Sequence, residues 1–427
     1  MSAKKSKNLL PIVVMFLLFF MIAFVTNFAG SMGVILKNQF NVPNALTQLG
    51  TLANFIAYAC MGIPAGIILR RKGYKFTSLL AVTVGFVGVG IQFLAGAVPA
   101  DSAFAVYVAG AFVAGFSMCL LNIVVNPMLN TLGGGGNRGN QLIQTGGTLN
   151  SLGGTIAPIL LGYLIGGSIE TATVGDAAPA MITAMAIFAL AFVVIILTAI
   201  PEPHMETAEE KTARLAAKVE GKKDQYSPLS FRHFVFGAIA IFFYVGVEVG
   251  IPNMANLYMS SHPLVGPAIA GTVVGLYWLM MLFGRFIGAS IGGKVSSKNM
   301  MIAVSSVAIA FLLCLMYMPE IMVTIPLVEV TVPLSMLFMV LCGLCTSVMW
   351  GAIFNLAAEG LGKYTAMASG IFMALVCGGG IMPFFQGLIA DYVGYLNSYW
   401  LVIAALIYIL WYALVGSKNV NKDISVE

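Results

Sequence analysis

Residues 122–167 read NIVVNPMLNTLGGGGNRGNQLIQTGGTLNSLGGTIAPILLGYLIGG, a run of amides and glycines set within an apolar chain. Of the 427 residues, 59% are hydrophobic and 9% are charged, and the mean hydropathy is +0.96. Soluble proteins carry about 25% charged residues, so this composition predicts a polytopic membrane protein. An unpaired polar group in a bilayer costs several kcal/mol. The amides of this stretch must therefore pair with other helices or line a water-filled cavity, which would be a binding site.

Windows of about 20 apolar residues, the length that crosses a bilayer, predict twelve transmembrane helices. The first window follows the basic start MSAKKSK. Its apolar run is longer than the about 7–15 residues of a signal peptide, so we interpret it as a first span. The expected bounds are 10–36, 46–69, 76–97, 104–131, 140–167, 179–200, 232–259, 266–292, 299–318, 332–358, 365–389 and 398–416.

Two glycine patterns recur at nearly the same spacing. GGTIAPILLG, which begins at Gly153, matches GGGIMPFFQG, which begins at Gly378, at an offset of 225 (378 minus 153). Gly62 matches Gly284 at an offset of 222 (284 minus 62). The two matches indicate duplication of a six-helix unit, the parallel repeat found in secondary transporters. We expect the glycines of both blocks to let helices pack closely.

The long polar stretch between the sixth and seventh windows divides the chain. We expect an N-terminal six-helix half at 1–200, a cytoplasmic linker at 201–231 and a C-terminal six-helix half at 232–427. The alternating charges of the linker fit either an interfacial helix or a plain connection. The predicted fold is therefore an all-α membrane protein of twelve transmembrane helices in two six-helix halves related by a parallel repeat.

The distribution of Lys and Arg predicts the orientation. Under this segmentation nearly all of them fall on one side, with Lys37 alone opposite, while the other side carries acidic loops. By the positive-inside rule both termini are expected to be cytoplasmic, in a multi-pass protein of the cytoplasmic (inner) membrane. The basic side holds Lys4, Lys5, Lys7, Arg70, Arg71, Lys72, Lys75, Arg138, Lys294, Lys298, Lys363, Lys418 and Lys422.

No metal, cofactor or nucleic acid is expected. The six cysteines lie in apolar runs without a second pair or a histidine at ligand spacing. The segment GGGGNRGN lacks the Lys and Ser/Thr of a phosphate-binding loop. The net charge of +5 comes from the basic loops rather than from a nucleic-acid-binding patch. We expect a monomer in the lipid bilayer.

At this level the chain resembles the major facilitator superfamily. The loop GIPAGIILRRKGYK at 62–75 resembles that superfamily's signature between spans two and three, without its usual acidic residue. Asn126-Pro127, NSLGG from Asn150, YVGVEVGIPNM from Tyr244 and SGIFMALVCGGGIMPFFQGLIAD from Ser369 resemble the fucose/glucose/galactose:proton symporter branch. The resemblance covers essentially the whole chain. It implies import of a monosaccharide by alternating access.

The chain departs from that branch at two acidic positions. The fucose permease type carries an Asp in the first span and a Glu four residues before the Asn-Pro pair. Here the first span, FLLFFMIAFVTNFAGSMGVIL, has no acid, and Asn122 stands at the Glu position. Proton coupling therefore cannot be carried over from those sites.

Glu248 is the acid that lies in the middle of a predicted span. An intramembrane carboxylate is costly unless it is protonated, paired or hydrated, so it is a candidate for proton coupling. The alternative is a carboxylate that helix partners hold as part of the fold. Arg285, near the expected cytoplasmic end of span eight, is predicted to extend to the interface or contact a loop rather than to touch substrate.

A sugar site needs amides within bidentate reach of hydroxyls and an aromatic face for the ring's C–H groups. Asn122 and Asn126 are four residues apart and share a helical face. Hydrogen bonding between helices is the alternative for the asparagines, and a place at the membrane interface is the alternative for the aromatic residues. The predicted substrate-binding residues are Asn27, Asn122, Asn126, Gln144, Asn150, Tyr244, Asn253, Trp278, Trp350 and Asn355.

The sequence leaves several functions open. We expect import of a hexose or 6-deoxyhexose with a coupled cation, the proton being favoured because of Glu248. A sodium-coupled transporter, a facilitator, and an exporter of drugs or metabolites with the same fold remain alternatives. A membrane-embedded enzyme is disfavoured because no nucleophile–base or metal constellation lies near a membrane boundary.

Overall fold

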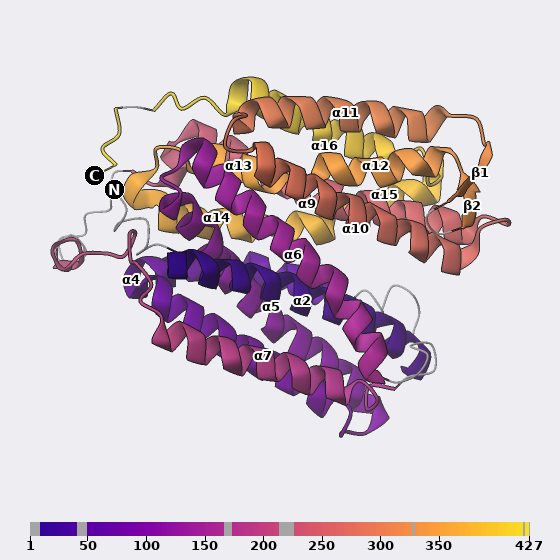
Figure 1. Cartoon of the computed structure of the whole chain (residues 1–427), viewed down its shortest axis with the longest axis horizontal. Coiled ribbons are helices and arrows are strands. Elements are labelled where there is room, and N and C mark those ends of the chain that lie inside the picture. The colour runs from indigo at the N-terminus through magenta and orange to yellow at the C-terminus, as the bar shows by residue number, and fades with distance from the viewer. Residues whose placement is uncertain are drawn as a thin grey trace.

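The computed structural model describes residues 9–40, 49–165, 173–212, 226–326, 329–421 and 423–426. Within these ranges it leaves undescribed the side chains of 24–38, 40, 49–51, 100–101, 157–162, 165, 260 and 266–268. Asn27 and Pro158 thus fall outside the described side chains. The described chain is mainly helical, and its long helices run roughly along one axis of the molecule (Figure 1).

The N-terminal half contains the six expected spans in five helical elements. One of them, α4, is two helices joined at Gly73, whose φ of 83° suits glycine better than other residues. The spans expected at 46–69 and 76–97 therefore follow one another through a single kink. The elements are α2 (Leu9–Phe40), α4 (Leu49–Leu94), α5 (Ala100–Leu132), α6 (Gly136–Ile165) and α7 (Ala178–Leu197).

The C-terminal half holds the other six spans, of which two are interrupted. The span expected at 332–358 breaks at Ser347–Val348, and the one expected at 365–389 passes through a short 3-10 turn at Leu375–Cys377. The span expected at 398–416 ends in a π-helical turn at Tyr412–Gly416. The helices are α9 (Arg232–Ser261), α10 (Gly266–Ile291), α11 (Ser297–Tyr317), α12 (Ser335–Thr346), α13 (Met349–Ala358), α14 (Thr365–Ala374), α15 (Gly378–Val393) and α16 (Tyr399–Trp411).

Helix length and composition agree with the expected spans. In the described chain, nine helical segments are long and apolar enough to cross a membrane, and α4 counts once among them although it holds two spans. The described apolar part of α2 is shorter, and α6 is rich in glycine and amides. With these two the spans number twelve, and the all-α fold predicted from the sequence is confirmed.

A small β-hairpin was not predicted. Strands β1 (Met322–Ile325) and β2 (Val330–Pro333) pair antiparallel, with Val323 opposite Val332. Alternating β-branched residues in both segments favour this pairing. Each strand has only four residues, which is too short for a clear sequence signal.

The repeated glycine blocks pack in equivalent ways, as the duplication predicts. A Cβ on Gly153 would lie 3.1 Å from the carbonyl carbon of Phe20, and one on Gly378 would lie 2.7 Å from that of Phe242. Phe20 and Phe242 are themselves 222 residues apart (242 minus 20). Both blocks therefore bring a backbone against the first helix of their own half, as expected for close helix packing.

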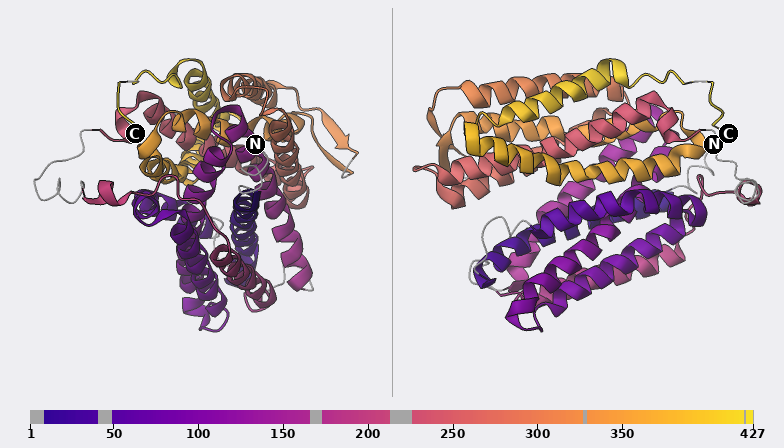
Figure 2. Two further views of the ribbon diagram at one scale, coloured as in Figure 1. Left: turned by 60° about the vertical axis from the view of Figure 1, so that its left-hand side comes forward. Right: turned by 180° about the vertical axis from the view of Figure 1, so that it is seen from behind.

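The two halves lie side by side, converge at the end that carries the termini and diverge toward the other end (Figures 1 and 2). At the converging end α4 meets α14 almost backbone to backbone. A Cβ on Gly62 would lie 2.6 Å from the carbonyl oxygen of Gly370 and 2.7 Å from Cα of Ala374, and one on Gly66 would lie 2.9 Å from the Ala366 oxygen. We call this end, defined by these five residues, the closed end.

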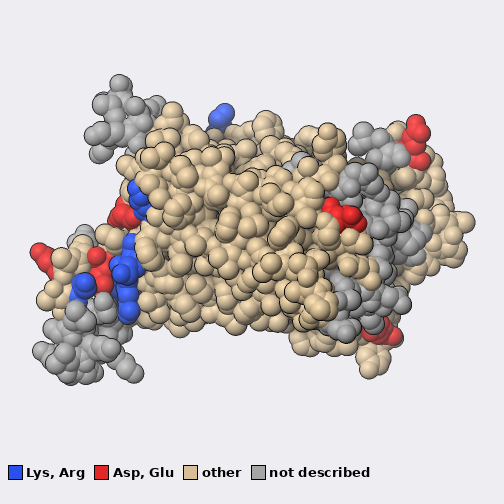
Figure 3. Space-filling view, turned by 90° about the horizontal axis from the view of Figure 1, so that it is seen from below, with Lys and Arg blue, Asp and Glu red and all other residues tan. Residues whose placement is uncertain are grey.

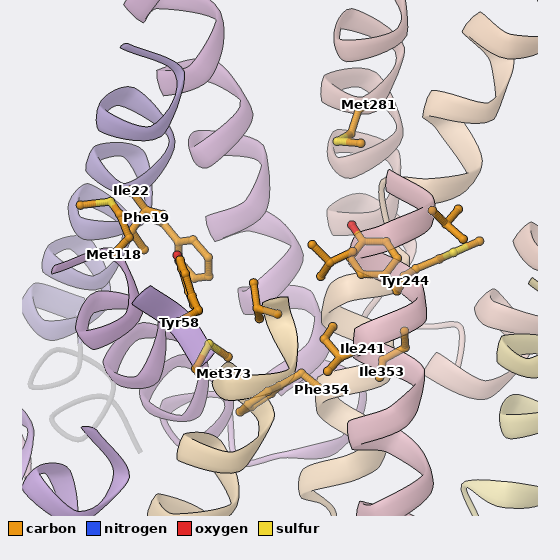
Figure 4. Packing of buried hydrophobic residues seen from close by; sticks show 14 of the residues in the cluster. Phe19, Ile22, Tyr58, Met118, Ile241, Tyr244, Met281, Ile353, Phe354 and Met373 are labelled. Atoms are coloured by element: carbon orange, nitrogen blue, oxygen red, sulfur yellow. The ribbon is translucent and has the colours of Figure 1, made fainter. Parts of the chain in front are cut away.

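Charge and hydrophobic packing follow the same layout. The Lys and Arg side chains visible in Figure 3 lie toward the closed end, whereas Asp and Glu are the charged residues seen at the other. The buried apolar residues of both halves belong to one cluster, which includes Tyr58 and Met118 of the first half and Tyr244 and Ile353 of the second (Figure 4). The charge sorting predicted from the sequence thus matches the arrangement in space.

Candidate functional site

In the described part of the chain, an ion pair in the interior joins charged side chains of two adjacent helices. Glu248 of α9 and Arg285 of α10 approach to 3.2 Å between Oε1 and Nη2. Their side chains are only 14% and 10% exposed. The prediction that Arg285 extends to the interface is therefore wrong, because the carboxylate draws the guanidinium inward. A buried pair of this kind persists only when further hydrogen bonds satisfy both partners.

Those further hydrogen bonds come from the opposite half. Nη1 of Arg285 donates to the Gly147 carbonyl at 3.1 Å, to Oδ1 of Asn150 at 3.2 Å and to Oγ of Ser151 at 2.9 Å. All three acceptors lie on α6. Nε of Arg285 also approaches the carbonyl of Ser347 at 3.4 Å, where α12 ends. One guanidinium thus joins the acid of its own half to three oxygens of the other.

Tyrosines surround Glu248 on its own side. The Tyr277 hydroxyl donates to the backbone carbonyl of Glu248 at 3.1 Å and also lies 3.0 Å from Oγ1 of Thr346. Tyr244 lies one helical turn before Glu248, is fully buried, and packs edge-on against Trp350 with ring centroids 6.3 Å apart. These contacts hold the acid at a fixed place between α9, α10 and α12.

The amides of α5 and α6 form one contact within their own half and two more between the halves. Asn122 donates to the Tyr58 hydroxyl at 2.9 Å, and Oδ1 of fully buried Asn126 accepts from the Trp350 indole N–H at 2.9 Å. Gln144 donates to the Val348 carbonyl at 2.8 Å. The same carbonyl also accepts from the Ala352 N–H at 3.2 Å, at the start of α13.

Asn150 has two roles in this arrangement. Its Nδ2 donates to the Phe19 carbonyl of α2 at 2.8 Å, while its Oδ1 accepts from Arg285. The amide therefore ties α2, α6 and α10 together. With Asn122, Asn126, Gln144, Tyr244 and Trp350, it belongs to the predicted residues that the structure places at the centre, where the halves meet.

The other predicted residues lie apart or point elsewhere. Asn355 is buried and donates to Ser297 at 2.9 Å, which links α13 to the start of α11 within one half. Asn253 is exposed, and five residues after Glu248 it lies about 140° around the helix. Trp278 is 38% exposed and lies two turns before Arg285 on the same face of α10. At Arg285 this face is covered by α6, whereas at Trp278 the side chain is partly exposed.

Arg285 and Ser151 are site residues that sequence reasoning misjudged or missed, whereas Tyr277 was considered with the other aromatic residues. For Arg285 a signal existed, since it is the cation within the apolar run 266–292 and intramembrane charges usually have partners. For Ser151 no signal distinguished it from an ordinary helix residue. Among the described residues, no group of three or more His, Cys, Asp or Glu side chains could hold a metal ion.

A second polar cluster lies at the closed end, outside the spans. Glu202, just after α7, accepts hydrogen bonds from the backbone N–H groups of Tyr74 and, at 2.9 Å, Lys75. Nζ of Lys75 in turn donates to the carbonyls of Ile196 at 2.7 Å and Thr198 at 3.0 Å. The start of the linker thus supplies a carboxylate to the loop that lacks the acid of the superfamily signature.

Burial sets the proton affinities of this cluster. It raises the pKa of Glu202 above its ordinary value, although the two backbone hydrogen bonds oppose the shift. It lowers the pKa of His204, whose ring contacts the Tyr74 hydroxyl, to about 4. The imidazole is therefore neutral at pH 7.

Comparison with known proteins places this geometry in a family. The sequence profile of the Major Facilitator Superfamily matches residues 14–382. The chain is 31% identical over 413 residues to the glucose/galactose transporter of Brucella abortus biovar 1 (strain 9-941), covering 94% of this chain and 93% of that protein. It is 21% identical over 426 residues to the L-fucose-proton symporter of Escherichia coli (strain K12), covering 92% and 90%.

A solved structure shows the same fold. The crystal structure of the major facilitator transporter FucP in the outward conformation superposes with a TM-score of 0.77 at 18% identity, covering 97% of this chain and all of that one.

Proposed function

The chain belongs to the major facilitator superfamily, and we propose that it imports a hexose or 6-deoxyhexose across the cytoplasmic membrane together with a proton. The observation that carries the proposal is the buried Glu248–Arg285 pair, which lies among amide and aromatic side chains where the two halves meet. The names of the glucose/galactose transporter and the L-fucose-proton symporter support a sugar substrate and a proton.

The substrate class follows from the side chains around the centre. Amides offer both a donor and an acceptor to a hydroxyl, and an exposed indole offers an apolar face to a sugar ring. We assign the platform to Trp278, on the open part of the α10 face, and the amide contacts to Asn122, Asn126 and Gln144. Asn126 and Gln144 now bond to the other half, and Asn122 bonds to Tyr58 of its own half. These partners are the groups that the amides would exchange for sugar hydroxyls.

Coupling is assigned to Glu248. A carboxylate in a membrane interior is stable as an anion only beside a cation, and Arg285 is that cation. When Glu248 is protonated the pair loses its attraction, so the proton changes the forces at the junction of the halves.

The expected orientation and organisation complete the proposal. Both termini are assigned to the cytoplasm because basic residues gather at the closed end (Figure 3). The closed end is then the cytoplasmic end, and the central site opens to the outside. We keep the boundaries 1–200, 201–231 and 232–427 for the two halves and the linker, and a monomer as the working unit.

Transport in proteoliposomes tests the proposal. Labelled glucose, galactose and fucose would be followed with and without an inward proton gradient. We expect gradient-driven accumulation of at least one sugar. Glu248→Gln should abolish accumulation but preserve sugar exchange, whereas Asp391→Asn, which alters an exposed acid near the end of α15, should preserve both.

Three outcomes of this experiment separate the alternatives. Equilibration that ignores the gradient and the Glu248→Gln substitution would identify a facilitator. Accumulation driven by a sodium gradient would show that sodium, and not a proton, is the coupled ion. No uptake of any of the three sugars would overturn the substrate class.

A further inference from the structure

We propose that Arg285 is a latch between the halves, and that protonation of Glu248 releases it and opens the closed end. The latch rests on the assignment of the proton to Glu248 under the proposed function. It goes beyond that assignment, because it names the contact through which the proton changes the conformation and the residues of α6 that receive it.

The first step is the division of the contacts between the halves. Arg285 reaches Glu248 within its own half and Gly147, Asn150 and Ser151 in the other, at 2.9–3.2 Å. The side chain is 10% exposed, so these oxygens rather than water satisfy its N–H groups. If α6 and α10 part at the closed end, the three bonds to α6 must break while the bond to Glu248 can remain.

The second step is charge. The three acceptors on α6 are a carbonyl, an amide and a hydroxyl, and none is an anion. α12, α13 and α16 contain no charged residue, while α6 and α15 carry only Arg138 and Asp391, both exposed near helix ends. Among the described residues, the titratable groups that face Glu248 are Arg285 and Tyr277 of α10 and Tyr244 of its own helix.

The third step gives the direction. With Glu248 ionised, the pair is neutral overall and the guanidinium can stay dry against α6. With Glu248 protonated, a full positive charge is left among neutral oxygens, and a buried charge without a counter-charge is strongly unfavourable. Hydration relieves it, and water reaches Arg285 when α6 and α10 separate. Protonation therefore favours opening of the closed end.

Asn150 provides a compensating substitution. Its Oδ1 is 3.2 Å from Nη1 of Arg285, so Asn150→Asp places a carboxylate beside the guanidinium from the other half. This variant should hold the closed end shut even when Glu248 is neutral. Asn150→Ala is the matched control, because it also loses the bond to Phe19 but adds no charge.

The experiment measures the separation of the halves directly. Spin labels would be attached at Arg138→Cys and Lys294→Cys, two exposed positions beside α6 and α10 at the closed end, in a background without native cysteines. Pulsed electron resonance then gives the populations of short and long distances in detergent or nanodiscs. No sugar and no gradient are needed.

We expect the unsubstituted site to shift from short to long distances as the pH falls. Glu248→Gln should show the long distance at every pH, with the ratio of populations changed about tenfold or more. Asn150→Asp should show the short distance at every pH, and Glu248→Gln with Asn150→Asp should recover it. Glu248→Gln with Asn150→Ala should stay long.

Two results would overturn the latch. One is a distance distribution that does not respond to pH or to Glu248→Gln. The other is a double variant with Asn150→Asp that remains as open as Glu248→Gln alone, since added charge would then not matter. The pH titration needs no substitution at the site, so it decides the question even if a variant misfolds. If the distances shift with pH as expected but no sugar is taken up, only the proposed substrate class would be overturned.

Discussion

Replacing Gly62 by alanine should open the closed end without unfolding the protein. The new Cβ would lie 2.6 Å from the Gly370 carbonyl oxygen and 2.7 Å from Cα of Ala374. These are backbone atoms and cannot rotate away, so α4 and α14 must separate. Overpacking of this kind costs about 1–3 kcal/mol. Because the cost falls only on the conformation in which the halves touch, the ratio of closed to open molecules should fall by roughly 5–150-fold.

Thiol labelling at the closed end would measure this shift. Met367 lines a hollow there with Ile67, Arg70, Arg71 and Glu206, and Met367→Cys in a background without native cysteines reports its accessibility to a polar reagent. Gly62→Ala should speed labelling.

The control is Gly387→Ala on α15, where a Cβ meets nothing within 4 Å, and it should leave the rate unchanged. Equal labelling rates for the two variants would refute the reasoning. A loss of unfolding free energy as large as the free-energy change implied by the labelling rates would also refute it. The contact would then stabilise the whole fold rather than the closed conformation.

Three further predictions concern other contacts. Trp350→Phe keeps an aromatic ring but removes the indole N–H, which leaves the buried Oδ1 of Asn126 unpaired. The closed state should lose about 1–3 kcal/mol of stability. The same thiol assay should then report faster labelling. Trp278→Ala should weaken sugar binding roughly tenfold, or about 1.4 kcal/mol, in a counterflow assay. Trp400→Ala, at an exposed position at the start of α16, should not. Burial lowers the pKa of His204 from 6.5 to about 4, so the unfolded chain binds its proton at higher pH than the folded one. Stability should therefore fall as the pH drops from about 6.5 toward 4, and His204→Gln should flatten that part of the melting-temperature curve.

The number and order of the helices could be predicted because the bilayer imposes them. A span requires about 20 apolar residues, and no soluble alternative is available to such a chain. The repeat could also be predicted from the matching glycine blocks, and Gly153 and Gly378 do make equivalent contacts in the structure. Element boundaries were less certain. The kink at Gly73 and the break at Ser347–Val348 depend on local backbone geometry and tertiary partners, which periodicity does not reveal.

The site could be predicted only in part, for a physical reason. Glu248 stands out because an acid inside a span needs an explanation. Its partner lies 37 residues away, near the end of another span, and the contact depends on how α9 and α10 pack. The acceptors on α6 are still harder to foresee, because they are set by the angle between two halves of 200 residues or so. Asn253 shows the same limit. It lies on a helix that was correctly predicted, but on a face that points away from Glu248.

The duplication also explains why two described junctions of the halves should respond differently to a proton. Gly66 and Gly288 are equivalent by the 222-residue offset, and both lie near a junction of the halves at the closed end. At Gly66 the neighbour is the backbone of α14, with a Cβ position 2.9 Å from the Ala366 oxygen, so this junction is held by shape alone. At Gly288 the nearest neighbour is the side chain of Val348 in its own half. The Gln144 side chain of the other half lies 3.7 Å away, and one turn away Arg285 crosses to α6. A change of charge leaves a contact between glycine backbones unaffected but alters one made by a guanidinium. We therefore expect α6 and α10 to release first and α4 and α14 to follow, so that Gly62→Ala changes the conformational equilibrium at every pH whereas Glu248→Gln removes its dependence on pH.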